Sequence, residues 1–126
     1  MSVLHAPKPR KTNIITAEEL RRIGWLQMME VELEDLERDL AKAHGWLRYH
    51  TWSAKHSPQG FPDDVLVRGT DLIFLENKRE HERYQPTAEQ IAWHAALRQV
   101  RNVHVDVVRP HDMDRIATML ERGLGK

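Results

Sequence analysis

Two carboxylates and one ammonium group stand at positions from which a short β-hairpin would bring them together. Asp63 ends the segment Gly60-Phe61-Pro62-Asp63, and Glu76 and Lys78 end the strand-like run that begins at Leu72. Carboxylate oxygens hold Mg²⁺, which keeps several waters and accepts phosphate oxygens as further ligands. A bound metal polarises the phosphate and lowers the pKa of a water, and a lysine can orient that water or stabilise the charged transition state. These residue types therefore indicate metal-assisted hydrolysis of a phosphodiester.

The segment between these residues predicts the hairpin. Residues 64–68 and 72–78 are rich in apolar and β-branched types, which favours two strands, and Gly69-Thr70-Asp71 between them favours a three-residue turn. If the two strands are antiparallel neighbours, the start of the first lies opposite the end of the second.

Strand alternation then decides which side chains meet. Alternate residues of a strand share a face, so Glu76 and Lys78 point one way and Asn77 points the other. Asp63, at the start of the first strand, lies opposite the end that carries them. We therefore expect Asp63, Glu76 and Lys78 to converge at one edge of the sheet.

The rest of the chain predicts further helices and two more strands. Capping-box patterns at Thr16 and Thr87 begin two helices; the first runs to Gly45 unless it is broken near Gly24. The other predicted elements are a strand over 46–52, a loop over 53–60, a charged irregular segment over 79–86, a strand over 103–108 and a helix over 113–121. The order α-β-β-β-α-β-α is typical of an α/β architecture, with a mixed sheet of about four strands flanked by helices.

Length and composition limit what this chain can be. With 126 residues, 40% hydrophobic and 30% charged, it fits one compact domain, which we place at residues 17–126. No apolar run approaches the ~20 residues that cross a bilayer, and residues 1–16 have the character of a flexible basic arm, not of a signal peptide. We therefore expect a cytoplasmic protein with no membrane partner. The absence of cysteine excludes disulfides, thiolate zinc sites and cysteine nucleophiles.

The charge balance does not by itself predict nucleic-acid binding. The formal net charge is zero, whereas a basic domain is the usual electrostatic footprint of a DNA-binding protein. Residues 17–44 carry eight acids against four bases, and residues 1–16 carry three bases and no acid. Any DNA contact would therefore use a local basic surface, helped by metal ions.

Several of these features together resemble a known nuclease superfamily. The segment Gly60-Phe61-Pro62-Asp63, the motif Glu76-x-Lys78 and Gln90 in the following helix are similar to the PD-(D/E)XK nucleases, and specifically to the VRR-NUC family. Its small stand-alone members are similar to Holliday-junction resolvases. The match includes Gly45-Trp46 before Tyr49-His50-Thr51 and extends from about Glu30 to Leu120.

The resemblance implies a fold and an activity. The fold would be a restriction-endonuclease-like core, and the activity a DNA endonuclease that uses Mg²⁺, with Mn²⁺ able to substitute, and no organic cofactor. The enzyme would be structure-selective, for branched DNA or a Holliday junction, and would act as a homodimer. Small nucleases of this kind are common in phages and prophages, which favours such an origin.

The resemblance also implies a role for each matching residue. Asp63 and Glu76 become metal ligands, and Asn77 becomes a ligand through its backbone carbonyl. Lys78 becomes the catalytic lysine and Gln90 a supporting residue of the active site.

The glutamate that the family carries in its first helix is less certain from the sequence. It falls fifteen residues before Gly45, at Glu30, which would be a further metal ligand or catalytic acid. Glu32 lies about 200° further round a helix, so only one of the two can face the site, and we favour Glu30. The chain departs from the family at Asn77, where an apolar or small residue is more usual, and Asp64 leaves the identity of the ligating aspartate open.

Each of these residues also has an ordinary structural interpretation. Glu76 and Lys78 alone would more often be a solvated ion pair, although the apolar residues before Glu76 on the same face favour burial. Gln90 is also the third helical residue of the Thr87 capping box, and Asp63 after a proline is typical of a turn. His50 either contacts phosphate or water or packs in a strand. The four tryptophans are expected to anchor the core or a dimer interface (Trp25, Trp46, Trp52, Trp93). Three basic residues in loops beside the site either contact phosphate or are plain surface charge (Lys55, Arg79, Arg83).

Two other kinds of function remain open at this point. The chain could be a non-catalytic DNA-binding module that retains the nuclease fold, or a structural protein whose strand pair is merely charged. The choice among junction, flap, nicked, duplex or single-stranded DNA depends on surfaces that the sequence does not place.

Overall fold

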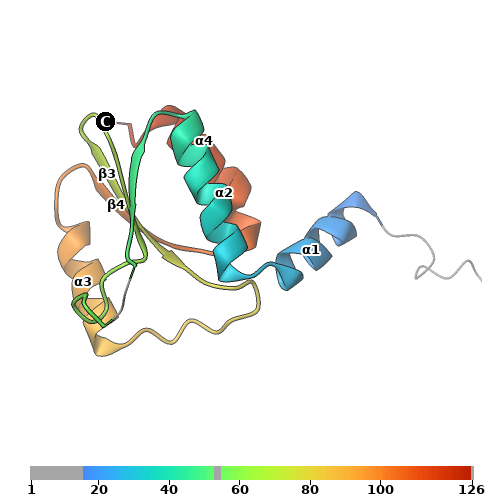
Figure 1. Ribbon diagram of the computed structural model, residues 1–126, viewed down its shortest axis with the longest axis horizontal. Helices are drawn as coiled ribbons and strands as arrows, with labels where there is room; N and C mark the ends of the chain where they lie inside the picture. Colours follow the sequence, from blue (N-terminus) through green and yellow to red (C-terminus); the bar gives the residue numbers. More distant parts are fainter. Residues whose placement is uncertain (1–15, 53–54, 126) are drawn as a thin grey trace, which may run out of the picture.

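The structure is a computed structural model that describes residues 16–52 and 55–125. A four-stranded sheet lies between helices, with the strands in the order β1-β2-β3-β4 (Figure 1). β1 pairs antiparallel with β2, β2 antiparallel with β3, and β3 parallel with β4. The predicted α/β class and mixed sheet of about four strands are confirmed.

The elements follow the predicted order with one helix more. They are α1 (Ala17–Gln27), α2 (Glu30–Ala43), β1 (Leu47–His50), β2 (Asp64–Arg68), β3 (Asp71–Asn77), α3 (Ala88–Arg98), β4 (Val103–Val108), the 3-10 turn η2 (Pro110–Asp112) and α4 (Met113–Arg122). Within the described ranges, no helix has the length and apolar character that crossing a bilayer requires.

The first predicted helix is two helices, and the break is not near Gly24. Gly24 lies inside α1, and the chain leaves the helical conformation at Met28 and Met29. The backbone N–H of Met29 donates to the Glu32 side chain at 2.9 Å, which gives α2 a helix start of its own. α1 projects away from the sheet (Figure 1). It contacts the body through Trp25, whose ring lies 6.2 Å from that of His111. The predicted basic arm lies outside the described residues except for Thr16, which caps α1.

The hairpin between β2 and β3 is tighter than predicted. Its turn is the pair Gly69-Thr70, because Asp71 already pairs with Arg68. Gly69 has a φ of 60°, and a positive φ at the first of two turn residues is a conformation that glycine adopts without steric cost. The strand ends at Asn77, and the N–H of Lys78 still bonds to the carbonyl oxygen of Val108 at 2.9 Å.

The main core lies between the sheet and the helices α2 and α4. Alternate residues of β3 point into it, so Ile73 and Leu75 are fully buried. Trp46 also packs there as a core anchor: its indole N–H donates to the Leu120 carbonyl at 2.7 Å, and the Arg68 guanidinium lies 4.7 Å from its ring centroid. The core consists of Leu33, Ala41, Trp46, Leu66, Ile73, Leu75, Val108, Ile116 and Leu120.

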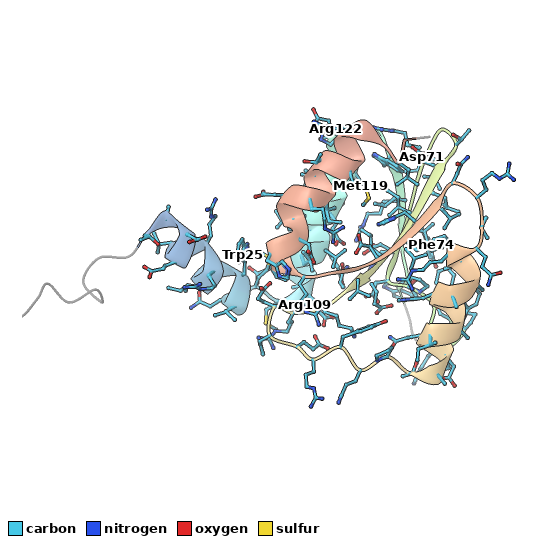
Figure 2. The ribbon with its side chains drawn as sticks, turned by 180° about the vertical axis from the view of Figure 1, so that it is seen from behind. Trp25, Asp71, Phe74, Arg109, Met119 and Arg122 are labelled. Carbon is cyan, nitrogen blue, oxygen red and sulfur yellow. The ribbon has the colours of Figure 1, made fainter. Side chains whose placement is uncertain are left out.

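The other face of the sheet is covered near β3 and β4 by α3. Figure 2 shows Phe74 on this side, and its ring meets Phe61 edge-on at 5.9 Å, while Phe61 meets Trp93 of α3 at 5.0 Å. Gly60, with a φ of 83°, lies against the start of α3 so closely that a Cβ would collide with the backbone of Glu89. Only glycine fits there, and the loop before β2 is thereby pressed onto the end of α3 that carries Gln90.

Candidate active site

Asp63 and Glu76 form an acid pair at the ends of β2 and β3. The register pairs Asp64 with Leu75, which sets Asp63 opposite Glu76. Asp63 also accepts a hydrogen bond on Oδ2 from the backbone N–H of Asn77 at 2.8 Å. The structure therefore brings together the two carboxyl groups that strand alternation predicted to meet.

The environment of Glu76 disfavours its charge. The residue is 5% exposed. Burial raises the pKa of Glu76 to about 8, and the negative charge of Asp63 and a hydrogen bond between the two carboxyl groups add to the rise. Glu76 Oε1 is buried without a hydrogen-bond partner among the described residues. A buried Glu76 with an unsatisfied oxygen beside the half-buried Asp63 fits a divalent cation, because the cation would satisfy the oxygen and remove the repulsion between the two carboxyl groups.

Lys78 lies on the same side of the strand end, but its closest acid is one that the sequence did not single out. Its Nζ lies 3.7 Å from Glu82 Oε2. Glu82 lies in the irregular segment after β3, where its Oε1 accepts a hydrogen bond from the Arg79 N–H at 3.1 Å. Burial works against ionisation of Glu82, but this bond, a hydrogen bond with Glu30 and the charge of Lys78 together lower its pKa. Lys78 and Glu82 are four residues apart in the sequence, but this spacing predicts a contact only within a helix, and the segment is irregular.

Glu30, not Glu32, lies at the site. Burial raises the pKa of Glu30 to about 7, and a hydrogen bond and like charge from Glu82, together with the charge of Asp63, act in the same direction. Glu32 is exposed and caps the start of α2. The first turn of α2 therefore contributes one acid beside Lys78, the acid pair and Glu82.

Gln90 forms the predicted capping box and also lies at the pocket. Its Oε1 accepts from the Thr87 N–H at 2.9 Å, and its own N–H donates to Thr87 Oγ1 at 3.1 Å, which is a capping box. It also lines a pocket of about 210 Å³ together with the acid pair. A volume of this size holds several waters at about 30 Å³ each. The remaining lining residues are Thr51, Ser57, Pro58, Gln59, Gly60 and Phe61.

The basic residues predicted as phosphate contacts do not form the pocket wall. Lys55 and Arg83 are exposed and Arg79 is half-buried, and none of the three is among the described residues that line the pocket.

His94 is a further residue at the site that the sequence did not reveal. It is 1% exposed, and its Nε2 lies 3.7 Å from Glu76 Oε1. Burial lowers the pKa of His94, Arg98 lowers it further and Asp63 opposes both, so the imidazole is neutral at pH 7. Its four-residue distance from Gln90 on α3 was the available signal, since such residues share one face of a helix.

Asp64 and His50 belong to the opposite face of the sheet. Asp64 is fully buried, and its Oδ1 lies 2.8 Å from Arg48 Nη2 and 3.1 Å from His50 Nδ1. His50 Nε2 lies 3.3 Å from Glu34 Oε1. Asp63 is therefore the aspartate that faces Glu76, and His50 is a packed strand histidine away from the pocket.

The arrangement limits how a metal ion would be held. In the described part of the chain, no three histidine, aspartate or glutamate side chains are grouped as a metal cluster. Glu30 is therefore not grouped with the acid pair as a third ligand here, and its role as a metal ligand stays a prediction from the sequence. The groups available for Mg²⁺ are the acid pair and the Asn77 carbonyl, and waters and substrate oxygens would complete the shell, as is usual for this ion.

Comparison with known proteins adds no relative. No protein-family model matches the chain, and no curated protein is significantly similar to it. The nuclease resemblance therefore depends on the residues named above and on their geometry.

Proposed function

We propose that the protein is a DNA endonuclease that hydrolyses phosphodiester bonds with Mg²⁺, or with Mn²⁺ in its place. The observation that carries the proposal is the acid pair beside Lys78, with a buried, unsatisfied oxygen on Glu76, at the wall of a pocket of about 210 Å³. Of the common ligands, a hard divalent cation that still keeps waters and phosphate suits this donor set best.

Each side chain has a separate part in the proposed reaction. Asp63 and Glu76 hold the ion, and the Asn77 carbonyl supports them. When bound, the ion would polarise the phosphate and lower the pKa of an attacking water. Lys78 stabilises the negative charge that develops on the phosphate, which is why its loss should harm chemistry more than metal binding. Glu82, 3.7 Å from Lys78 Nζ, holds this ammonium group in position, and the negative charge of Glu30 interacts with it.

We extend the same proposal to the class of fold. We assign the chain to the restriction-endonuclease-like class. The assignment is supported by an antiparallel meander of three strands, then a helix, then a fourth strand parallel to the third. Functional residues in such a sheet come from the ends of adjacent central strands, and Asp63, Glu76 and Lys78 lie at such ends.

The proposed enzyme acts as a homodimer on branched DNA, such as a Holliday junction, of which two strands must be cut. Support for a partner comes from β1 and the residues after it, where Leu47 is 77%, Tyr49 60% and Trp52 88% exposed. Large apolar side chains exposed together mark interaction surfaces. The phage or prophage origin and the cytoplasmic location remain predictions from the sequence.

The proposal is tested by a cleavage panel. Junction, flap, nicked, duplex and single-stranded DNA, labelled at one end, are incubated with the protein in Mg²⁺, in Mn²⁺ and in chelator. We expect metal-dependent cleavage that is strongest for a branched form. DNA binding without cleavage in any metal would instead support a non-catalytic binding module, and neither binding nor cleavage would refute a role on DNA.

A further inference from the structure

Three buried polar side chains meet directly beneath the acid pair, on the opposite face of the sheet. Asp63 and Asp64 are consecutive, as are Glu76 and Asn77, so one member of each pair faces the pocket and the other faces α2. Asn77 Nδ2 donates to Asp64 Oδ2 at 3.0 Å. The contact between Asp64 and Asn77 is thus the counterpart, below the sheet, of the contact between Asp63 and Glu76 above it.

Glu37 of α2 completes this group, which we call the polar triangle (Glu37, Asp64, Asn77). Its Oε1 accepts the second N–H of Asn77 Nδ2 at 3.0 Å. Burial raises the pKa of Glu37 to about 9, and the charge of Asp64 and a hydrogen bond with it act in the same direction. Glu37 therefore accepts a hydrogen bond from Asn77, and its carboxyl group lies against that of Asp64.

Burying the polar triangle costs free energy, because its surroundings are apolar. Its three members are 0%, 0% and 1% exposed, and they adjoin a core of leucine, isoleucine and valine. Buried polar groups of this kind often contribute no more stability than apolar side chains of similar volume would. Their presence at this place therefore calls for a reason beyond packing.

The elements that the polar triangle joins supply that reason. It links α2, β2 and β3, and these carry Glu30, Asp63 and Glu76 respectively. Asn77 also reaches the upper face, because its backbone N–H donates to Asp63 Oδ2 at 2.8 Å. A shift of Asn77 would therefore move Asp63, Glu76 and the Asn77 carbonyl together.

We infer that the polar triangle is a positioning device that sets the affinity of the acid pair for its divalent ion. The inference rests on the proposed function and extends it, because it assigns Glu37, Asp64 and the Asn77 side chain to the site although none of them contacts the pocket. Hydrogen-bonding partners behind metal ligands typically change metal affinity or activity by about 10–100-fold when they are removed.

The decisive variant is Asn77→Leu, which removes both donors and keeps the backbone and approximate volume. Binding of Mn²⁺ to the full chain is measured by calorimetric titration, and unfolding is measured separately by thermal denaturation. We expect Mn²⁺ to bind about 10–100-fold more weakly than to the wild type. Glu37→Gln is the conservative partner: its amide can donate to Asp64 and its carbonyl can accept from Asn77, so we expect Mn²⁺ affinity within about twofold of wild type.

Two further variants keep the test decisive. Glu37→Leu removes one corner of the triangle without exposing a charge, and it should weaken Mn²⁺ binding even if Asn77→Leu does not fold. Leu33→Ala leaves a cavity in the same layer of α2 and should lower the melting temperature without changing Mn²⁺ affinity. The inference is overturned if the folded triangle variants bind Mn²⁺ as the wild type does, or if Leu33→Ala weakens binding equally. If the wild type binds Mn²⁺ and cleaves DNA, and the triangle variants bind Mn²⁺ equally well, the inference fails and the proposed function stands. If the wild type neither binds Mn²⁺ nor cleaves DNA, the inference and the proposed function are both refuted.

Discussion

Replacing Glu76 by glutamine should stabilise the metal-free protein at high pH while it removes the metal site. Glu76 is 5% exposed, and its pKa rises from the ordinary 4.5 to about 8. As the pH rises above 4.5, the unfolded chain loses this proton first and the folded protein keeps it. The free energy of unfolding of the wild type therefore falls between about pH 4.5 and pH 8, because the folded state holds the proton that the unfolded state has released.

The size of the effect follows from the same change in pKa. A rise from 4.5 to about 8 corresponds to about 5 kcal/mol as an upper value. The carboxyl group of Glu76 is hydrogen-bonded to that of Asp63 and the site can relax, so we expect a smaller difference, about 2–4 kcal/mol, between Glu76→Gln and the wild type at pH 8. Near pH 4 the difference should be close to zero, since both side chains are then neutral in both states.

The assay is urea denaturation in chelator from pH 4 to pH 9. The raised pKa values of Glu30 and Glu37 also make the free energy of unfolding fall as the pH rises. This contribution is present in both proteins, so the difference in free energy of unfolding between Glu76→Gln and the wild type reports on Glu76 alone. Glu89→Gln, an exposed change at the start of α3, is the matched control and should show no growing difference. Saturating Mg²⁺ should then stabilise the wild type by about 2.7 kcal/mol at one hundred times its dissociation constant, and the variant hardly at all. A difference that does not depend on pH would refute the burial of a protonated Glu76.

Three other predictions test neighbouring parts of the account. Gly60→Ala should lower the free energy of unfolding by at least about 1–2 kcal/mol, because an alanine there is strained at a positive φ and its Cβ collides with α3. Gly24→Ala, in open space on α1, should raise the free energy of unfolding by about 0.5–1 kcal/mol. Equal effects of the two variants in urea denaturation would contradict the packing of the loop before β2 on α3. Asp63→Asn should abolish cleavage and leave the fold intact. Asp64→Asn should lower the free energy of unfolding by about 3 kcal/mol, because Arg48 is left without a counter-charge. If Asp64→Asn instead lost cleavage without losing stability, Asp64 and not Asp63 would be the aspartate of the active site. Trp52→Ser should convert a dimer to a monomer in analytical ultracentrifugation, and a wild type that is monomeric with and without junction DNA would exclude this interface.

The acid pair could be predicted from sequence because strand geometry leaves little freedom. A period of two places Glu76 and Lys78 on one face for any register, and a short hairpin allows Asp63 only one neighbourhood. The two-residue turn moved the strand boundary by one residue without changing which groups meet. The choice of Asp63 over Asp64 needed the structure, since both lie next to the strand end and only the observed pairing shows which one faces Glu76.

The surrounding acids could not be predicted in the same way. Glu30, Glu34 and Glu37 are chemically identical helix residues, and the way α2 lies on the sheet decides that Glu37 is fully buried while the other two are half-buried. Glu82 reaches Lys78 through an irregular segment that has no repeat to place it. His94 approaches Glu76 only because Gly60 allows α3 to lie close to the loop before β2. Each of these contacts depends on tertiary packing rather than on local periodicity.

The central claim is that Asp63, Glu76 and Lys78 form one metal-dependent hydrolytic site, and a single-turnover cleavage rate tests it most directly. The preferred DNA from the panel is cut in saturating Mg²⁺ by the wild type, by Lys78→Ala and by Lys42→Ala, a matched change at an exposed lysine of α2. We expect Lys78→Ala to bind DNA and metal but to cleave at least about 10²-fold more slowly, and Lys42→Ala to cleave at the wild-type rate. Cleavage by Lys78→Ala at the wild-type rate would contradict the account.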